Sequence, residues 1–353
     1  AGPFSEPVIF FNDIRRTDEQ KGVFGELNIA LSDTSELTVG ARYYDIEVDF
    51  EGSANSSFGN GFGNPDEQRF GSNLSVQYAP GNENGYPDVA KSDGVIGKLT
   101  YSWNPSEDVM YYVTWSEGFR PGLLNRPVGS SNADGSYTVK PEVESDDITN
   151  VEFGWKTILQ DGRLRFNGSV FNVDVEGLQS TIFDPSIVNL FFSDNAANAT
   201  IEGVEGDFTY FTNVDGLSIA GAFSFLNTNI DEKLVPTNDV VVGSELAFAP
   251  GHQGNLRVRQ EVGMSGGNVG HLQVQYTFSD SSFSDIMEPN KAVQGSYSYM
   301  DLRAGISNDE LTAELYVDNV TDERAEISNT FVFDRQRIAY IRPTTIGIRV
   351  KKN

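Results

Sequence analysis

Hydrophobic and polar residues alternate with a period of two along much of this chain. In the segment 92–103, Val95, Leu99 and Tyr101 fall on one face, and Lys98 and Thr100 fall on the other. A period of two is typical of a strand with one apolar face, whereas an amphipathic helix repeats every 3.6 residues. Similar patterning predicts thirteen strands, near residues 18–32, 36–50, 92–103, 108–119, 146–159, 163–177, 199–212, 217–228, 254–263, 269–279, 296–306, 311–319 and 343–351.

One of these strands changes phase. Its apolar positions run Leu164, Phe166 and Val170 and then move to the other face at Phe171 and Val173. A β-bulge would shift the phase in this way, and so would an apolar contact on the otherwise polar face. The sequence leaves both explanations open.

The segments between the strands alternate in length. Short links are expected at residues 32–35, 104–107, 160–162, 213–216, 263–268 and 307–310, and long polar segments at 51–91, 120–145, 178–198, 229–253, 280–295 and 320–342. Short turns at one rim and long loops at the other are typical of an outer-membrane barrel, whereas the connections of a soluble sandwich mix both kinds. The pattern therefore predicts an all-β fold, a transmembrane antiparallel up-and-down β-barrel.

Thirteen is an odd number of strands, and bacterial single-chain barrels have even counts. If the short turns face the periplasm, the last strand ends on the periplasmic side and residue 1 lies outside. We therefore expect a further strand at Pro7–Phe11 and more strands upstream of Ala1. No apolar run reaches the roughly 18–20 residues that a spanning helix needs, which excludes a helical membrane protein but not a barrel.

The composition narrows the function further. The 353 residues include no cysteine, and 51 acidic against 25 basic residues give a formal net charge of −26. Such a field repels nucleic acids, and the absence of thiols excludes disulfides and thiolate metal sites. The acidic surplus fits either steering of cationic ligands or divalent bridging to lipopolysaccharide, and the sequence does not separate the two.

Catalytic chemistry finds no support in the sequence. The two histidines, His252 and His271, lie in no recognisable catalytic motif, and a surface or rim position explains His252 better than a hydrolase triad does. The glycine-rich run 59–63 precedes no helix pattern, and the cluster 132–135 lacks the spacing of a calcium loop. We expect no enzyme activity, no cofactor and no metal site.

Several motifs resemble those of the TonB-dependent outer-membrane receptors. The matching stretches, in order, are 19–26 with 37–43, then 111–122 (YYVTWSEGFRPG) continued by Asn125-Arg126-Pro127, then Pro141-Glu142 with 151–156 (VEFGWK), and finally 319–324 (NVTDER). Each motif is moderately specific, but four in the family's order span nearly the whole chain. One departure is the end of the chain, Lys351-Lys352-Asn353, where such barrels usually finish on an aromatic residue.

The resemblance implies a 22-stranded barrel filled by an N-terminal plug domain. Residues 1–353 would then be the C-terminal portion of one barrel domain, about 13–14 strands, with the plug absent. The resemblance also implies TonB-powered import of a scarce nutrient, most commonly a ferric siderophore. Expected partners are outer-membrane lipid and lipopolysaccharide, the TonB complex acting through the missing N-terminal region, and the nutrient itself.

Ligand capture would fall to the long loops, above all 51–91 and 120–145. The first of these holds Phe58, Phe62 and Phe70 among Asn, Gly and Ser residues, and aromatic-plus-polar loops suit adaptable recognition. Packing of these rings within the loop is an equally good explanation. We also place Arg120 and Asn125 in this set of candidate ligand-binding residues. By alternation Arg120 faces the lumen or its mouth, where contact with plug or loop carbonyls is preferred over contact with ligand.

Two other readings of the sequence stay open. A complete, plugless barrel of about 14 strands would act as a passive channel, and a signal peptide directly before Ala1 would favour it. A soluble secreted β-protein, such as a carbohydrate-binding module, is the alternative outside membranes. Solubility without detergent would identify the latter.

Overall fold

The computed structural model describes residues 10–56, 89–125, 139–140, 142–183, 191–332 and 335–352, and its main feature is one antiparallel sheet of thirteen strands. In sheet order the strands are β1 (Phe10–Ser32), β2 (Ser35–Ser56), β3 (Val89–Ser106), β4 (Val109–Arg120), β7 (Asp146–Leu159), β8 (Leu164–Phe183), β9 (Phe191–Phe211), β10 (Leu217–Lys233), β11 (His252–Gly263), β12 (Val269–Ser279), β15 (Tyr297–Ser307), β16 (Leu311–Asp318) and β19 (Thr345–Lys352). Every one of the thirteen predicted strands is confirmed.

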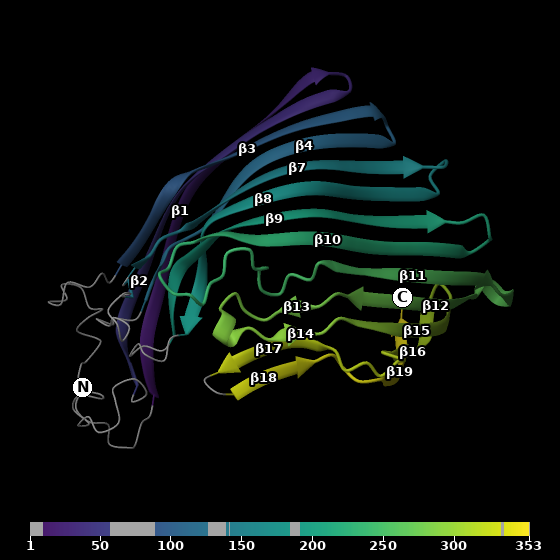
Figure 1. The fold of residues 1–353 in the computed structure, drawn as a ribbon. Helices are drawn as coiled ribbons and strands as arrows, with labels where there is room; N and C mark the ends of the chain where they lie inside the picture. The colour runs from purple at the N-terminus through teal and green to yellow at the C-terminus, as the bar shows by residue number, and fades with distance from the viewer. Residues whose placement is uncertain are drawn as a thin grey trace.

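Each strand of the sheet pairs with the strands before and after it, so the topology is an up-and-down meander. Figure 1 shows the strands running side by side in a curved sheet, with the short links of β7–β8, β9–β10 and β11–β12 at one end. We call that end the turn rim and the opposite end the loop rim. In the described part of the chain, β1 and β19 form the two edges of the sheet.

Two boundaries differ from those expected. The predicted extra strand at Pro7–Phe11 is wrong where the structure describes it, because Phe10 and Phe11 begin β1 and pair with Ser56 and Asn55. The segment 178–198, expected as a loop, is largely strand, since β8 runs to Phe183 and β9 starts at Phe191. Both errors arise at the loop rim, where the alternation changes character.

Small hairpins within the long connections were not foreseen. They are β5 (Leu123–Leu124) with β6 (Glu142–Val143), β13 (Ser282–Phe283) with β14 (Val293–Gln294), and β17 (Glu326–Val332) with β18 (Arg335–Tyr340). Two 3₁₀ turns, η1 (Ser265–Gly267) and η2 (Glu288–Asn290), lie in the part of the chain that the structure describes. No helix in the described ranges is long and apolar enough to cross a membrane.

The sheet has one strongly apolar face toward the turn rim. Its side chains are large, hydrophobic and exposed; Leu99, Val113, Phe153 and Leu256 are examples, each with more than two fifths of its surface open. On the opposite face of the same strands lie polar residues. A wall with this pattern is apolar toward lipid and polar toward a lumen, so we call the two faces the outer face and the inner face.

Near the loop rim the two faces exchange character. On β10 the outer face runs from Phe225 to Asn227 and Asn229, while the inner face turns apolar and reaches the fully buried Ile230. On β8 the same exchange falls between Val170 and Phe171. The register with β7 is regular from Leu164 through Glu176, so no bulge causes the phase change there, and the apolar contact on the polar face is the explanation that the structure confirms.

Inner apolar side chains near the loop rim form a packed core beneath the connections. This loop-side cluster comprises Val139, Ile182, Phe192, Ala196, Ala197, Ile230, Val235, Val240, Ile286 and Met287. It joins three strands of the wall, β8, β9 and β10, to the β4–β7, β10–β11 and β12–β15 connections. Burial of this kind contributes roughly 1.5–3 kcal/mol for each large side chain, and it fixes where the loops begin.

Candidate functional site

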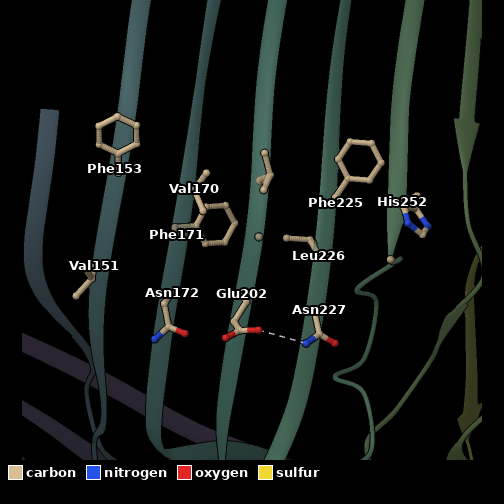
Figure 2. Close-up of a pocket in the computed structure, with 13 residues that line it drawn as sticks. Val151, Phe153, Val170, Phe171, Asn172, Glu202, Phe225, Leu226, Asn227 and His252 are labelled. Atoms are coloured by element: carbon tan, nitrogen blue, oxygen red, sulfur yellow. Dashed lines mark hydrogen bonds between the residues drawn. The ribbon is translucent and has the colours of Figure 1, made fainter. Parts of the chain in front are cut away.

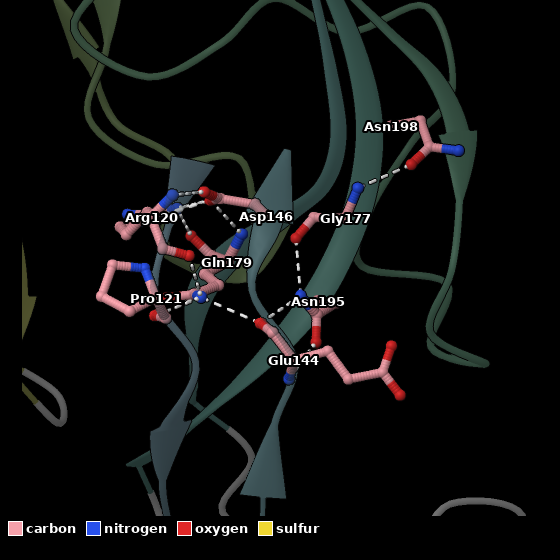
Figure 3. Close-up of polar contacts among 8 residues, drawn as sticks. All are labelled: Arg120, Pro121, Glu144, Asp146, Gly177, Gln179, Asn195 and Asn198. Carbon is pink, nitrogen blue, oxygen red and sulfur yellow. Dashed lines mark hydrogen bonds and ion pairs between the residues drawn. The ribbon is translucent and has the colours of Figure 1, made fainter. Parts of the chain in front are cut away.

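A polar network at the loop rim joins the ends of β4, β7, β8 and β9 (Figure 3). Its centre is an ion pair between Arg120, the last residue of β4, and Asp146, the first residue of β7. The Asp146 side chain is only 2% exposed, whereas that of Arg120 is 51% exposed. The Arg120 amide and Nε donate to the carboxylate at 3.1 and 2.9 Å, and Nη2 contacts it as well. The two residues are also direct cross-strand neighbours.

Gln179 on β8 ties this pair to the next strands. Its amide N–H donates to Asp146 at 3.3 Å, and its carbonyl accepts from Arg120 Nη2 at 3.0 Å. Its buried side-chain amide donates to the carbonyls of Pro121 and Glu144 at 3.0 and 2.9 Å. The carboxylate of Asp146 is thus surrounded by donors, as a buried charge requires.

The third part of the network stabilises a bulge in β8. The register shifts between Val175 and Leu178, where Gly177 takes a positive φ of 67° that favours glycine. Asn195 donates to the carbonyls of Gly177 and Glu144 at 2.7 and 2.9 Å, and Asn198 accepts from the Gly177 amide at 2.8 Å. Side chains therefore replace the ladder bonds that the bulge interrupts.

Asn125 lies just past the β5 strand and is 6% exposed. Its side-chain amide donates to the carbonyls of Lys140 and Ser193 at 2.8 and 2.7 Å, and its carbonyl oxygen accepts from the Ser193 amide at 2.8 Å. These bonds hold the two ends of the 121–143 connection against β9. Contact between Asn125 and a ligand stays a prediction.

A second polar knot organises the NVTDER segment. Asn319 is 4% exposed with a positive φ of 52°. Its side-chain amide donates to the carbonyls of Glu323 and Arg342, each at 2.9 Å, while its carbonyl oxygen accepts from the Glu323 amide at 2.9 Å. The Thr344 hydroxyl donates to the Asn319 carbonyl at 2.8 Å. This motif fastens the start of the β16–β19 connection to its end.

The carboxylate next to this knot is tuned by its contacts. Asp322 accepts from the Thr344 amide at 3.1 Å and from Arg324 at 3.2 Å. The backbone hydrogen bond from Thr344 is the largest cause, and with Arg324 it holds the pKa of Asp322 below its usual value. The opposite holds for Asp285, which directly precedes two members of the loop-side cluster: burial raises its pKa despite bonds from the Met287 and Ile286 amides.

The structure describes two of the five sequence-predicted site residues, and each of them has its own set of hydrogen-bond partners. Arg120 and Asn125 both lie at the loop rim, and the register places Arg120 on the inner face, as alternation predicts. Phe58, Phe62 and Phe70 lie outside the described residues. Asp146 and Gln179 were missed, because a carboxylate among 51 acidic residues and a glutamine in an expected loop give no local signal.

Each of the two histidines contacts a carboxylate of a neighbouring segment. His252 is more than half exposed at the loop-rim end of β11, with Nδ1 3.1 Å from Asp280. His271 is buried on the inner face of β12, where Nε2 lies 3.1 Å from Glu314. Arg303 and Arg349 approach the same carboxylate at 3.4 and 3.5 Å. Such a cluster ties β12, β15, β16 and β19 together.

The meander, the two-faced wall and the sorting of long connections to one rim define an outer-membrane β-barrel wall. The chain belongs to the TonB-dependent receptor-like β-barrel family, whose model matches residues 2–320. The predicted resemblance is therefore confirmed. Members of this family are outer-membrane proteins of Gram-negative bacteria.

Several solved structures have a similar fold. The chain is similar to the ferric yersiniabactin uptake receptor of Yersinia pestis (TM-score 0.72, 16% identity), to a siderophore receptor of Acinetobacter baumannii (0.66, 15%) and to the ferripyoverdine receptor of the outer membrane of Pseudomonas aeruginosa (0.61, 15%). In each case 96% of this chain is covered, but only 46%, 43% and 39% of the other. The chain thus spans less than half the length of these receptors. A comparison with curated proteins found no significant match.

Proposed function

We propose that the protein containing this chain is an outer-membrane receptor that binds a ferric siderophore at the loop rim and imports it with energy from TonB. The observation that carries the proposal is the wall itself, a thirteen-stranded meander of this family whose long connections all emerge at one rim. The solved structures of this fold include receptors for ferric yersiniabactin and ferripyoverdine, which supports a ferric siderophore as the substrate class.

In this proposal residues 1–353 are the C-terminal portion of one barrel domain. The two sheet edges, β1 and β19, expose unpaired backbone groups that would be very costly in lipid. Further strands of the parent protein would pair with both edges and close the barrel, and a plug domain would fill it. The coverage of less than half of the uptake receptors agrees with this arrangement.

The network around Arg120 would lie at the mouth of the import pathway. It fixes the root of the 121–143 connection while leaving half of the Arg120 side chain accessible. A guanidinium on a rigid support can donate to carbonyls of a plug or to oxygens of a ligand without losing much side-chain freedom. The role is one of recognition, and no chemical step on the substrate is required.

Growth under iron limitation tests the proposal. Deleting the parent gene should abolish uptake of one ferric siderophore from a panel, and inactivating TonB should have the same effect. Restoring the gene should restore uptake of that compound alone. Uptake that persists without TonB would identify a passive channel, and unchanged growth on every ferric siderophore of the panel would exclude this substrate class.

A further inference from the structure

The connection between β10 and β11 continues the wall beyond the sheet. β11 begins at His252, and Figure 2 shows the chain that leads into His252 running beside the last residues of β10. The Leu226 amide donates to the Gly251 carbonyl at 2.9 Å, and the Ile230 amide donates to the Ser244 carbonyl at 2.9 Å. The connection therefore takes the place of β11 along the loop-rim end of β10.

The same connection is joined to the next one along the rim. Val240 forms an antiparallel bridge with Met287, and Ala247 forms a parallel bridge with Phe283. Phe283 belongs to β13, whose partner β14 lies against β17, and Figure 1 shows β13, β14, β17 and β18 side by side. We call the β10–β11 and β12–β15 connections, together with the β17–β18 hairpin, the collar. Because Val240 and Met287 are buried in the loop-side cluster on the inner face, the collar lies at the mouth of the lumen.

Phe248, within the collar, combines a strained backbone with an exposed aromatic ring. Its φ is +56°, and of the five non-glycine residues with positive φ in the described part of the chain it is the one with an apolar side chain. Bulky residues rarely adopt this left-handed conformation, whereas glycine adopts it without strain. The Phe248 residue is 50% exposed, so burial offsets only part of that strain. Its amide donates to the Phe283 carbonyl at 2.7 Å, a bond that glycine would make equally well.

The level of Phe248 along the wall separates its ring from the lipid-facing band. The segment 244–251 runs beside the end of β10, and there the outer face of β10 already carries Asn227 and Asn229. Strained backbone is found at ligand sites more often than elsewhere. An exposed ring on a fixed support also offers a stacking surface to another flat group.

We propose that Phe248 contacts the imported siderophore and stacks on one of its aromatic iron-binding groups. The inference rests on the proposed import function and adds a chemical class of substrate to it, a ferric siderophore with aromatic rings. The bonds of the collar hold the Phe248 backbone in place before binding, so little further order is lost when the two rings stack.

The test uses the purified parent protein in detergent micelles and two probes, a ferric siderophore with catecholate groups and one with only aliphatic hydroxamates. Calorimetric titration should show binding of the catecholate probe and much weaker binding of the hydroxamate probe. Phe248→Gly should lower the affinity for the catecholate probe about tenfold, the loss expected when one of two stacked rings is removed. Phe248→Tyr keeps the ring and should bind as the unsubstituted protein does.

Gln160→Gly is the matched control. Gln160 has nearly the same φ, +55°, in the β7–β8 turn at the opposite rim. Both glycine variants should keep the unfolding midpoint of the unsubstituted protein, because glycine adopts a positive φ without strain. Only Phe248→Gly should lose affinity, which separates contact with the siderophore from a general effect on the fold.

Several results would overturn the proposal. Equal affinities of Phe248→Gly and Gln160→Gly would show that the ring does not contact the siderophore, and equal or tighter binding of the hydroxamate probe would show that an aromatic group is not recognised. Weaker binding by Phe248→Gly together with release of the plug, detected as new protease cleavage, would assign the ring to the plug. These outcomes leave the import function standing. If the unsubstituted protein binds no ferric siderophore of the growth panel, the import function fails and this inference fails with it.

Discussion

The two ends of strand β10 carry side chains suited to different surroundings. Toward the turn rim, Phe223 and Phe225 point outward while Ala220 and Ala222 point inward. Toward the loop rim, Asn227 and Asn229 point outward and Ile230 is buried inside against the connections. The register of β10 with β9 is unbroken from Ser218 to Ile230. A single regular strand therefore passes from surroundings of lipid to surroundings of water.

The difference shows that the face on which a side chain lies does not by itself determine whether its surroundings are apolar or aqueous. Near the turn rim, hydrophobic side chains stabilise the protein by facing lipid, whereas near the loop rim they stabilise it by packing under the connections. Polar side chains on the inner face near the turn rim face a lumen, whereas polar side chains on the outer face near the loop rim face the aqueous exterior. Matched substitutions on the two sides of the exchange test this interpretation.

The largest effect is expected inside, near the loop rim. Ile230→Asp should cost about 4 kcal/mol of unfolding free energy, because it removes a fully buried side chain and places an unpaired carboxylate in the loop-side cluster. Ala220→Asp on the same face of β10, opposite Arg257, should change little. Denaturant titration of the parent barrel in detergent micelles measures both, and equal costs would contradict the comparison.

On the outer face the ranking should reverse. Leu99→Arg lies in the apolar part of β3 and should cost about 3 kcal/mol in lipid, as cations do near the middle of a barrel's apolar band. Asp93→Arg, on the same face of the same strand past the exchange, should stay within about 0.5 kcal/mol. Folding titrations in lipid vesicles are the measurement. A costly Asp93→Arg would mean that the lipid extends further toward the loop rim.

The ion pair at the mouth should have an intermediate effect. Asp146→Asn removes a nearly buried charge and weakens the bonds to Arg120 and Gln179, at a cost of about 2 kcal/mol, below that of a fully buried pair because Arg120 is half exposed. Asp18→Asn, which breaks the exposed pair with Arg16, should cost about 0.5 kcal/mol or less. Unfolding midpoints of the two variants compare a packed pair with a solvated one.

The smallest effect concerns pH. The pKa of Asp322 is lowered, chiefly by the Thr344 amide, so its stabilising contribution is present above the unfolded pKa of about 3.9 and is lost as pH falls through the folded pKa. The pKa of Asp285 is raised by burial, so its protonation on acidification favours the folded loop. The protection of the Thr344 amide from hydrogen exchange, measured relative to its intrinsic rate at each pH, should fall below about pH 4, and Asp322→Asn should abolish that dependence. Protection of the Thr344 amide that does not change with pH in the unsubstituted protein would refute the assignment.

Much of this wall could be read from the sequence because strands in lipid obey a simple rule. Alternation located all thirteen strands, and link length separated the two rims. The rule failed where the lipid ends: residues 178–183 were expected as part of a loop, whereas β8 continues through them to Phe183. Periodicity alone could not show that the inner face had become the apolar one.

The site was less predictable than the fold. Alternation gave the face of Arg120 but not its partner Asp146, which lies 26 residues away in sequence. That pairing depends on the register of β4 with β7, which only the folded sheet defines. The roles of Asn125 and Asn319 are also set by backbone groups, and a sequence does not display backbone contacts.

The position along the strands at which the outer face changes from apolar to polar shifts from strand to strand across the sheet. The cross-strand row that contains Leu99 on β3 continues through Trp115, Val151, Asn172, Glu202 and Asn227. On β3 the apolar outer face extends beyond this row to Val95. On β15 it ends at Met300, whose own row passes through Tyr276, Leu256 and Gly221 on β12, β11 and β10.

This drift records the angle at which the strands cross the bilayer. The boundary moves by about ten residues over about eight strand-to-strand steps, and with roughly 3.4 Å per residue and 4.8 Å between strands the strands lean about 40° from the membrane normal. That value falls within the roughly 35–45° of outer-membrane barrels. The tilt of the strands in the bilayer is therefore encoded in the sequence, as the slope of the boundary between apolar and polar side chains on the outer face.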